Sequence, residues 1–421
     1  RDRASSFIGL RGLPTESGWP HLRGRRAAVT RAGLVELLPS IEQTTLLRAA
    51  LGTSRSGPDD LKLVDRMIGA LATLPPAAQV AVKGLRPLLA RSEGVSTDRF
   101  QRDTVTALRT GMAREAIRVA SVQALVRQAL TAVSATGHPF LVVRGVALAE
   151  TGYPDPVTRH CHDLDLYLPI ESRPAIAGAL SATGFGVAQD DPSRPPGEER
   201  WVHPSGFPVE LHTTFFPERY YSLPPEWVWS GATTRPILGI PVRIPAPGDH
   251  LVLVLGLASC TPQRSTLRWV TDSWFLLTET AEFPWERFLD GMREARLALP
   301  VSVMLTYLSD EVGAPVPEEV LRTVRSEAAE APPLARDIAF FWANALPAGT
   351  VRGEREPIGF WSSTWLLGLK LWPSRAYMAH AYPEKRGFML WWYFRRLARG
   401  ATKALDARKS PRSPIRTTER Q

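Results

Sequence analysis

The spacing of apolar residues changes twice along the chain, and this constrains the fold more than any other feature. From Thr30 to about residue 130, apolar side chains recur every three or four positions, which is typical of amphipathic helices. After Gly137 they gather in short runs between Gly- and Pro-rich turns, which is typical of strands. From Gly248 onward the helical spacing returns. This order predicts an α+β fold in which a small mixed sheet is flanked by helical regions.

The net charge of +9 is concentrated near the C-terminal end. From Arg395 onward there are nine basic residues and two acidic ones, so the preceding chain is nearly neutral. A nearly neutral body gives little support to nucleic-acid binding by the whole protein. Hydrophobic pattern and charge together predict five segments: a flexible lead-in at 1–29, an N-terminal helical domain at 30–130, a sheet core at 131–240, a C-terminal helical domain at 241–400 and a basic disordered tail at 401–421.

Composition excludes several classes of protein. Of the 421 residues, 44% are hydrophobic and 22% are charged, which is the balance of a globular protein and not of a disordered chain. The longest apolar candidate segment, Leu251–Cys260, is shorter than the roughly 18 residues that a membrane helix needs. Two cysteines, Cys161 and Cys260, cannot form a disulfide framework. We therefore expect a cytoplasmic protein without a transmembrane segment.

The core contains five short runs that we interpret as strands. Arg144-Gly145 ends the first run and opens a helix, and the residues from Asp190 to Arg200 are polar and Pro-rich, which predicts a loop. The runs lie at Phe140–Val143, Asp163–Leu168, Phe185–Val187, Trp201–His203 and Phe207–Thr213. The last two flank a Pro-Ser-Gly turn and are expected to form a hairpin.

Asp163-Leu164-Asp165 is the most informative triplet in the core. Residues two apart in a strand point to the same face, so both carboxylates are expected to project together while Leu164 points into the core. Glu210, between Val209 and Leu211, is a third acid that faces away from the core. Oxygen-ligated Mg²⁺ is the natural partner of such acids. Two ions held in this way would suit phosphoryl or nucleotidyl transfer; the alternative is a set of solvated acids.

Arg144-Gly145 and Arg159 are candidates for phosphate binding. A glycine lets backbone approach a phosphate, a helix N-terminus supplies amide donors, and arginine adds charge-assisted hydrogen bonds. Arg159, four residues before Asp163, can bind phosphate or pair with the acids. The alternatives are an ordinary strand-to-helix turn for Gly145 and an ordinary surface arginine for Arg159.

At these residues the sequence resembles the uncharacterised bacterial nucleotidyltransferase family of the DNA polymerase beta-like superfamily. The resemblance covers about residues 30 to 390. Its motifs are Val143–Ala149, Tyr153-Pro154-Asp155-Pro156, Arg159, Asp163–Leu166, Val209–His212, Pro247–Asp249 and Leu267–Asp272. Three positions depart from the family pattern. Arg144 replaces a lysine, Glu210 replaces an aspartate, and Ala258 lies near the place of a histidine on the helix after Asp249.

The resemblance implies a nucleotidyltransferase core and transfer of a nucleoside monophosphate from an NTP to an acceptor, with release of pyrophosphate. It implies that Asp163, Asp165 and Glu210 hold a two-metal site for Mg²⁺, with Mn²⁺ as the alternative ion. Glu210 also becomes a candidate general base. The triphosphate ligands it implies are Arg144, the Gly145 backbone and Arg159. His212 and Asp272 are implied as supporting or acceptor-side residues, with a purely structural role as the alternative.

The acceptor is left open by the sequence. The resemblance points to a peptide natural product, a protein or a small molecule. Because related toxin-type nucleotidyltransferases modify tRNA, RNA bound through the basic tail is the alternative acceptor. The departures at Arg144 and Glu210 also leave open a non-catalytic scaffold built on a decayed transferase fold.

Overall fold

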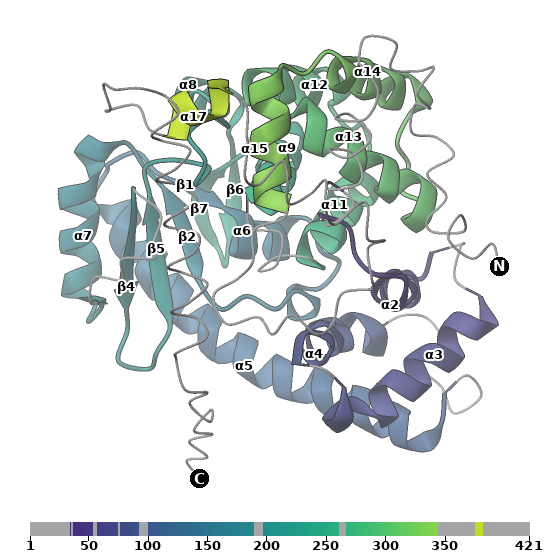
Figure 1. Cartoon of the computed structure of the whole chain (residues 1–421). Helices are drawn as coiled ribbons and strands as arrows, with labels where there is room; N and C mark the ends of the chain where they lie inside the picture. Colours follow the sequence, from purple (N-terminus) through teal and green to yellow (C-terminus); the bar gives the residue numbers. More distant parts are fainter. Residues whose placement is uncertain are drawn as a thin grey trace, which may run out of the picture.

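The computed structural model describes residues 34, 37–53, 57–74, 76–91, 100–188, 197–260, 267–343 and 375–381. The expected lead-in at 1–29 and the expected basic tail at 401–421 lie outside these ranges. The described part is an α+β structure with one mixed sheet, a two-stranded ribbon and helices on both sides of the sheet (Figure 1). The predicted fold class is therefore confirmed.

The mixed sheet has the order β1-β2-β5-β4-β3. Its strands are β1 (Leu141–Val143), β2 (Leu164–Tyr167), β3 (Gly186–Val187), β4 (Glu198–Val202) and β5 (Pro208–His212). Strands β2 and β5 are parallel, whereas the other neighbouring pairs are antiparallel. Because β2 and β5 lie next to each other inside the sheet, their side chains form its centre.

The strands differ from the sequence prediction in three main respects, apart from shifts of a single residue at other strand ends. Asp163 precedes β2 by one residue. Residues 198–200 were predicted to be part of a loop, but they begin β4, where Glu198 and Arg200 pair with β5. The charged side chains of these residues concealed the alternation that predicts a strand. A ribbon of β6 (Thr233–Ile237) and β7 (Ile240–Ile244) was missed. Its two turn residues, Leu238 and Gly239, both have positive φ angles of 51° and 83°, which suits a tight hairpin that lacks the usual Asn-Gly signal.

One face of the sheet is covered by α5 (Arg102–Ala135) and α7 (Arg173–Ala182), seen behind and beside the sheet in Figure 1. Leu164 and Leu166 of β2 and Val209 and Leu211 of β5 pack into this apolar layer and are at most 2% exposed. Because side chains alternate along a strand, Asp165 and Glu210 must point to the opposite face. The buried layer thus fixes the direction of the acids.

Helices from both ends of the chain pack together in a second core. Thr44 of α2 contacts the Tyr307 hydroxyl at 2.8 Å, and Arg48 contacts Glu311 at 2.7 Å. The N-terminal helices are α2 (Ile41–Leu51), α3 (Pro58–Gly69) and α4 (Pro76–Arg91). The short core helices are α6 (Arg144–Thr151) and α8 (Pro225–Gly231). The C-terminal helices are α9 (Pro247–Cys260), α11 (Arg268–Glu279), α12 (Trp285–Glu294), α13 (Ala298–Tyr307), α14 (Glu318–Ala329), α15 (Pro333–Ala343) and α17 (Arg375–Ala381). Within the described ranges, none of the helices combines the length and apolar character needed to cross a bilayer.

Candidate active site

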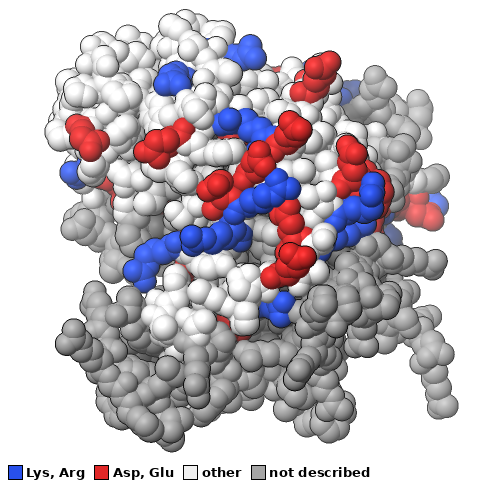
Figure 2. Space-filling model, turned by 90° about the horizontal axis from the view of Figure 1, so that it is seen from above, with Lys and Arg blue, Asp and Glu red and all other residues white. Residues whose placement is uncertain are grey.

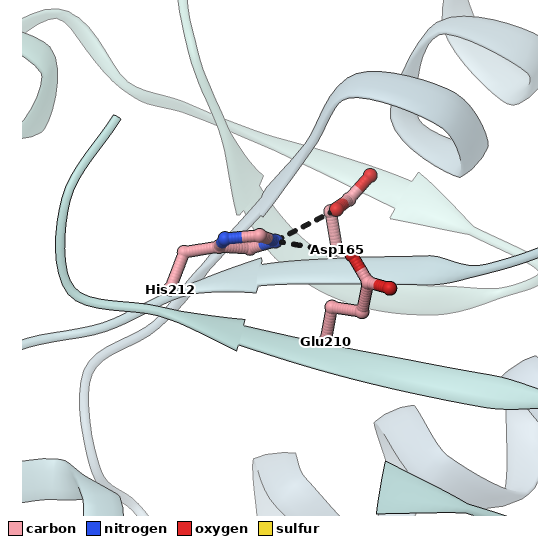
Figure 3. Close-up of side chains that lie close together, drawn as sticks. All are labelled: Asp165, Glu210 and His212. Carbon is pink, nitrogen blue, oxygen red and sulfur yellow. Dashed lines mark hydrogen bonds and ion pairs between the residues drawn. The ribbon is translucent and has the colours of Figure 1, made fainter. Parts of the chain in front are cut away.

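Two acids from neighbouring strands meet at the centre of the sheet. Asp165 of β2 and Glu210 of β5 are direct partners in the parallel register. Their side chains are 6% and 15% exposed. Side chains of directly opposed residues on one sheet face lie close together, so two carboxylates share one small, largely dry space. Figure 3 shows both carboxylates on the same side of the two strands.

His212 completes this group from β5. Its Nε2 donates a hydrogen bond to Asp165 Oδ1 at 2.8 Å and lies 3.8 Å from Glu210 Oε2 (Figure 3). One ligand atom from each of Asp165, Glu210 and His212 lies within 4.8 Å of the others. Two carboxylate oxygens and an imidazole nitrogen at this separation can hold a divalent cation. The group therefore fits a metal ion on its donor chemistry.

Asp163 lies beside this group. Its Oδ2 is 3.5 Å from His162 Nε2, and a Cβ added at Gly145 would lie 3.7 Å from its Oδ1. Burial and then the charge of Asp165 raise the pKa of Asp163 above its ordinary value. Of the three predicted acids, Asp165 and Glu210 thus share one group with His212, and Asp163 is their neighbour in the same electrostatic cluster.

The carboxyl groups of the cluster differ in how readily they ionise. Burial, followed by repulsion from Asp165, Asp163 and Glu198, raises the pKa of Glu210 to about 8. Burial also opposes ionisation of Asp165, but the Arg144 guanidinium and the His212 hydrogen bond outweigh it and lower its pKa to about 2. Glu210 and Asp163 therefore hold their protons more tightly than an ordinary carboxyl, and a cation placed among them would favour their ionised forms.

Arg144 is held over the acids by an unusual backbone. Its φ is 59°, a left-handed conformation that costs a residue with a Cβ roughly 1–2 kcal/mol. Its N–H donates to His250 Nε2 at 3.2 Å. Its guanidinium donates to Asp165 Oδ1 and to the Phe215 carbonyl, both at 3.2 Å. These three contacts stabilise the strained residue and direct its charge at the acidic group.

His250 is the residue of this site that the sequence prediction missed. The prediction looked for a histidine near Ala258, but the histidine of α9 that reaches the site lies at its beginning. Burial lowers the pKa of His250 to about 4, so the ring is neutral at pH 7 and its Nε2 can accept the Arg144 N–H. The available signal was Asp249-His250, two polar residues that open an otherwise apolar helix.

Arg159 lies away from open solvent and is paired with Asp272. Its Nε and Nη2 donate to the two carboxylate oxygens of Asp272 at 2.8 Å each, and the pair is 8% and 6% exposed. The Tyr153 hydroxyl donates to the same carboxylate at 2.7 Å. A Cβ at Gly145 would lie 3.0 Å from Arg159 Nη1, so the glycine makes room for this pair. The network joins the loop before β2 to α11.

A buried acidic cluster on two neighbouring strands, with a cation beside it, is the kind of site that enzymes use to transfer phosphorus-containing groups. The family model described as an uncharacterised nucleotidyltransferase matches residues 77–311, more than half of the chain, and the protein belongs to this family. It is therefore a transferase of the nucleotidyltransferase class. No curated protein sequence and no solved structure matches the chain at a significant level.

Glu210 is expected to make the metal-free protein less stable as the pH rises. Its pKa is about 8 in the fold against 4.5 in an unfolded chain, so between these values the folded state holds a proton that the unfolded state has lost. Linkage then lowers the free energy of unfolding by on the order of 3 kcal/mol between about pH 5 and pH 8. Urea unfolding in a chelator at the two pH values measures this, and Glu210→Gln should remove most of the difference. An undiminished pH dependence in the variant would contradict the assignment to Glu210.

Proposed function

We propose that the protein transfers a nucleoside monophosphate from an NTP to an acceptor and releases pyrophosphate, with Mg²⁺ as the metal. The observation that carries this proposal is the pairing of Asp165 with Glu210 across two strands, with Asp163 and His212 beside them. Membership of a nucleotidyltransferase family supports the reaction class. Family membership alone leaves the position of the site open, and the acidic cluster supports the position proposed here.

Asp163, Asp165 and Glu210 are the residues proposed to hold the metal, in a two-metal site that Mn²⁺ can also fill. When bound, the metal would supply positive charge that polarises the phosphoryl oxygens. It would also stabilise the negative charge on the attacking and leaving oxygens. Of the three, Asp165 is the most suitable metal ligand, because Arg144 and His212 keep its carboxylate ionised and fix its direction. His212 is therefore proposed as a positioning residue.

Glu210 is also proposed to accept the proton of the acceptor group. A general base works best when its pKa lies near the operating pH, and burial beside other acids brings the pKa of Glu210 to about 8. Arg200 on β4 lies 3.7 Å from Glu210 Oε1 and limits that shift. The longer side chain, in place of the aspartate of the family pattern, extends this carboxylate further from β5.

We propose a peptide, protein or small molecule as the acceptor, with RNA as the alternative. The face seen in Figure 2 carries acidic and basic side chains in alternation, so its described part offers mixed charge to a partner. RNA binding favours a continuous basic surface, which by composition the 401–421 tail would supply. We therefore prefer a peptide, protein or small molecule over RNA as the acceptor.

We further propose that the catalytic core spans 131–240 and that the flanking helical domains span 30–130 and 241–400. The acids proposed to hold the metal, Asp163, Asp165 and Glu210, all lie in the core, and Asp272 on α11 braces it from outside. The cytoplasm is the proposed compartment, because it supplies NTPs and because Cys161 and Cys260 are both free and buried.

Binding of a non-hydrolysable NTP in the presence and absence of Mg²⁺, measured by isothermal titration calorimetry, tests this function. We expect Mg²⁺ to strengthen NTP binding at least about tenfold, because the acids otherwise repel the phosphates. Glu199→Gln should bind the NTP like the wild type, because Glu199 lies on β4 on the face opposite the acids and pairs with Arg173. Absence of NTP binding by the folded protein with Mg²⁺ would favour the scaffold alternative.

A further inference from the structure

Both arginines expected to bind the triphosphate are already engaged by protein groups. Arg144 contacts Asp165 and the Phe215 carbonyl, and Arg159 makes a bidentate pair with Asp272 at 8% exposure. An NTP brings several negative charges, and phosphate oxygens are bound most strongly by charge-assisted hydrogen bonds. The proposed reaction therefore needs a further cation that is exposed and lies beside the acids.

Arg268 is such a cation. It is the first residue of α11, and its side chain is exposed. Its Nη2 donates to His162 Nδ1 at 3.2 Å. Among the described residues, no carboxylate lies within ion-pair distance of it. A guanidinium has five N–H donors, so most of those on Arg268 remain available to a ligand.

His162 connects Arg268 to the acidic cluster. Because Nδ1 of His162 accepts from Arg268, the ring proton must be on Nε2, and this nitrogen lies 3.5 Å from Asp163 Oδ2. The chain of contacts Arg268–His162–Asp163 thus places a guanidinium that has no ion-pair partner among the described residues on the Asp163 side of the cluster. Arg144 occupies the Asp165 side.

The helix that carries Arg268 is fixed firmly to the core. Asp272 follows Arg268 by four residues, so both project from the same face of α11. Asp272 is bound by Arg159 and by the Tyr153 hydroxyl. A guanidinium on a braced helix is presented in a constant position, which favours binding of a bidentate anion.

We propose that Arg268, oriented by His162, binds the β- and γ-phosphates of the NTP and so holds the pyrophosphate that leaves. This inference rests on the proposed function and names a triphosphate ligand that is neither Arg144 nor Arg159. It divides the site into a side at Asp165 and Glu210, where transfer takes place, and a side at Asp163, where the leaving group is held.

The test compares Arg268→Gln with the wild type in calorimetric titrations of a non-hydrolysable NTP and of inorganic pyrophosphate, each with Mg²⁺. Both affinities should fall at least about tenfold, because one strong charge-assisted contact is lost. Arg268→Lys should be intermediate, since it keeps the charge and loses the bidentate geometry. His162→Ala should weaken the same two ligands. Arg322→Gln, an exposed arginine on α14, is the matched control and should bind like the wild type.

Binding of Mg²⁺ alone separates a phosphate ligand from a structural role. It should be unchanged in Arg268→Gln, whereas a distorted site would weaken it together with the other ligands. Wild-type affinity of Arg268→Gln for both phosphate ligands would overturn the inference and leave the proposed function standing. If the wild type itself bound neither ligand, both would be overturned. Thermal unfolding of each variant shows that it is folded, as expected for a substitution at an exposed position.

Discussion

Glu210→Gln is expected to lower nucleotidyl transfer about 1,000-fold or more while leaving the protein folded. The substitution keeps the size of the side chain but removes a carboxylate oxygen that is proposed to hold the metal and to accept the acceptor's proton. Loss of several kcal/mol of transition-state stabilisation corresponds to about this factor. The variant is also expected to unfold at higher urea concentration than the wild type at pH 8 without metal, because the crowded charge of Glu210 has been removed.

The combination of lower activity and higher metal-free stability distinguishes a functional acid from a structural one. Transfer is measured as label from an α-labelled NTP retained on an acceptor in a cell extract. Glu210→Asp restores the residue of the family pattern and should regain much of the activity. Glu199→Gln on the opposite face should stay within about twofold of the wild type. A Glu210→Gln variant that transfers label at the wild-type rate would exclude Glu210 from the mechanism.

Asp272→Ala is expected to destabilise the protein by about 3–5 kcal/mol. It leaves the Arg159 guanidinium buried without its counter-charge, and such an uncompensated charge is among the most costly single changes in a fold. The Tyr153 hydroxyl loses one of its two hydrogen-bond partners at the same time and keeps Thr271. The free energy of unfolding, measured by urea denaturation at pH 7, gives the size of the effect.

Asp290→Ala is the matched control for this prediction. Its ion pair with Arg293 is exposed, at 55% and 44%, so its loss should cost less than about 1 kcal/mol. Replacing both Arg159 and Asp272 by apolar residues should recover part of the stability, because no buried charge is then left alone. An effect of Asp272→Ala as small as that of Asp290→Ala would contradict the structural role of the pair.

The direction of the acids could be predicted from the sequence because it depends on local periodicity alone. In a two-residue repeat, Leu164 and Leu166 must enter the core, so Asp165 must point away from it. The same holds for Glu210 between Val209 and Leu211, and both acids lie on the face opposite the apolar layer. The sequence could not predict whether Asp163 or Asp165 lies opposite Glu210, because this depends on the register of β2 with β5.

The partners of the basic residues depend on contacts between distant parts of the chain. Arg159 was a candidate for phosphate, but its guanidinium meets Asp272, 113 positions further along. Gly145 was expected to be the residue that lets the backbone approach a phosphate at this strand-to-helix turn, yet the positive φ belongs to Arg144 and is stabilised by His250, 106 positions away. Neither contact leaves a trace in local spacing, so neither was available to sequence reasoning.

The role of these residues as metal and nucleotide ligands stays a prediction, and one comparison of two labels tests it most directly. The wild type is incubated with Mg²⁺, a cell extract and an NTP labelled either at the α- or at the γ-phosphate. Transfer of a nucleoside monophosphate predicts that the α-label becomes fixed to an acceptor and that the γ-label is released as pyrophosphate, with neither occurring in Glu210→Gln. Fixation of the γ-label, or of neither label by a folded protein that binds Mg²⁺, would contradict it.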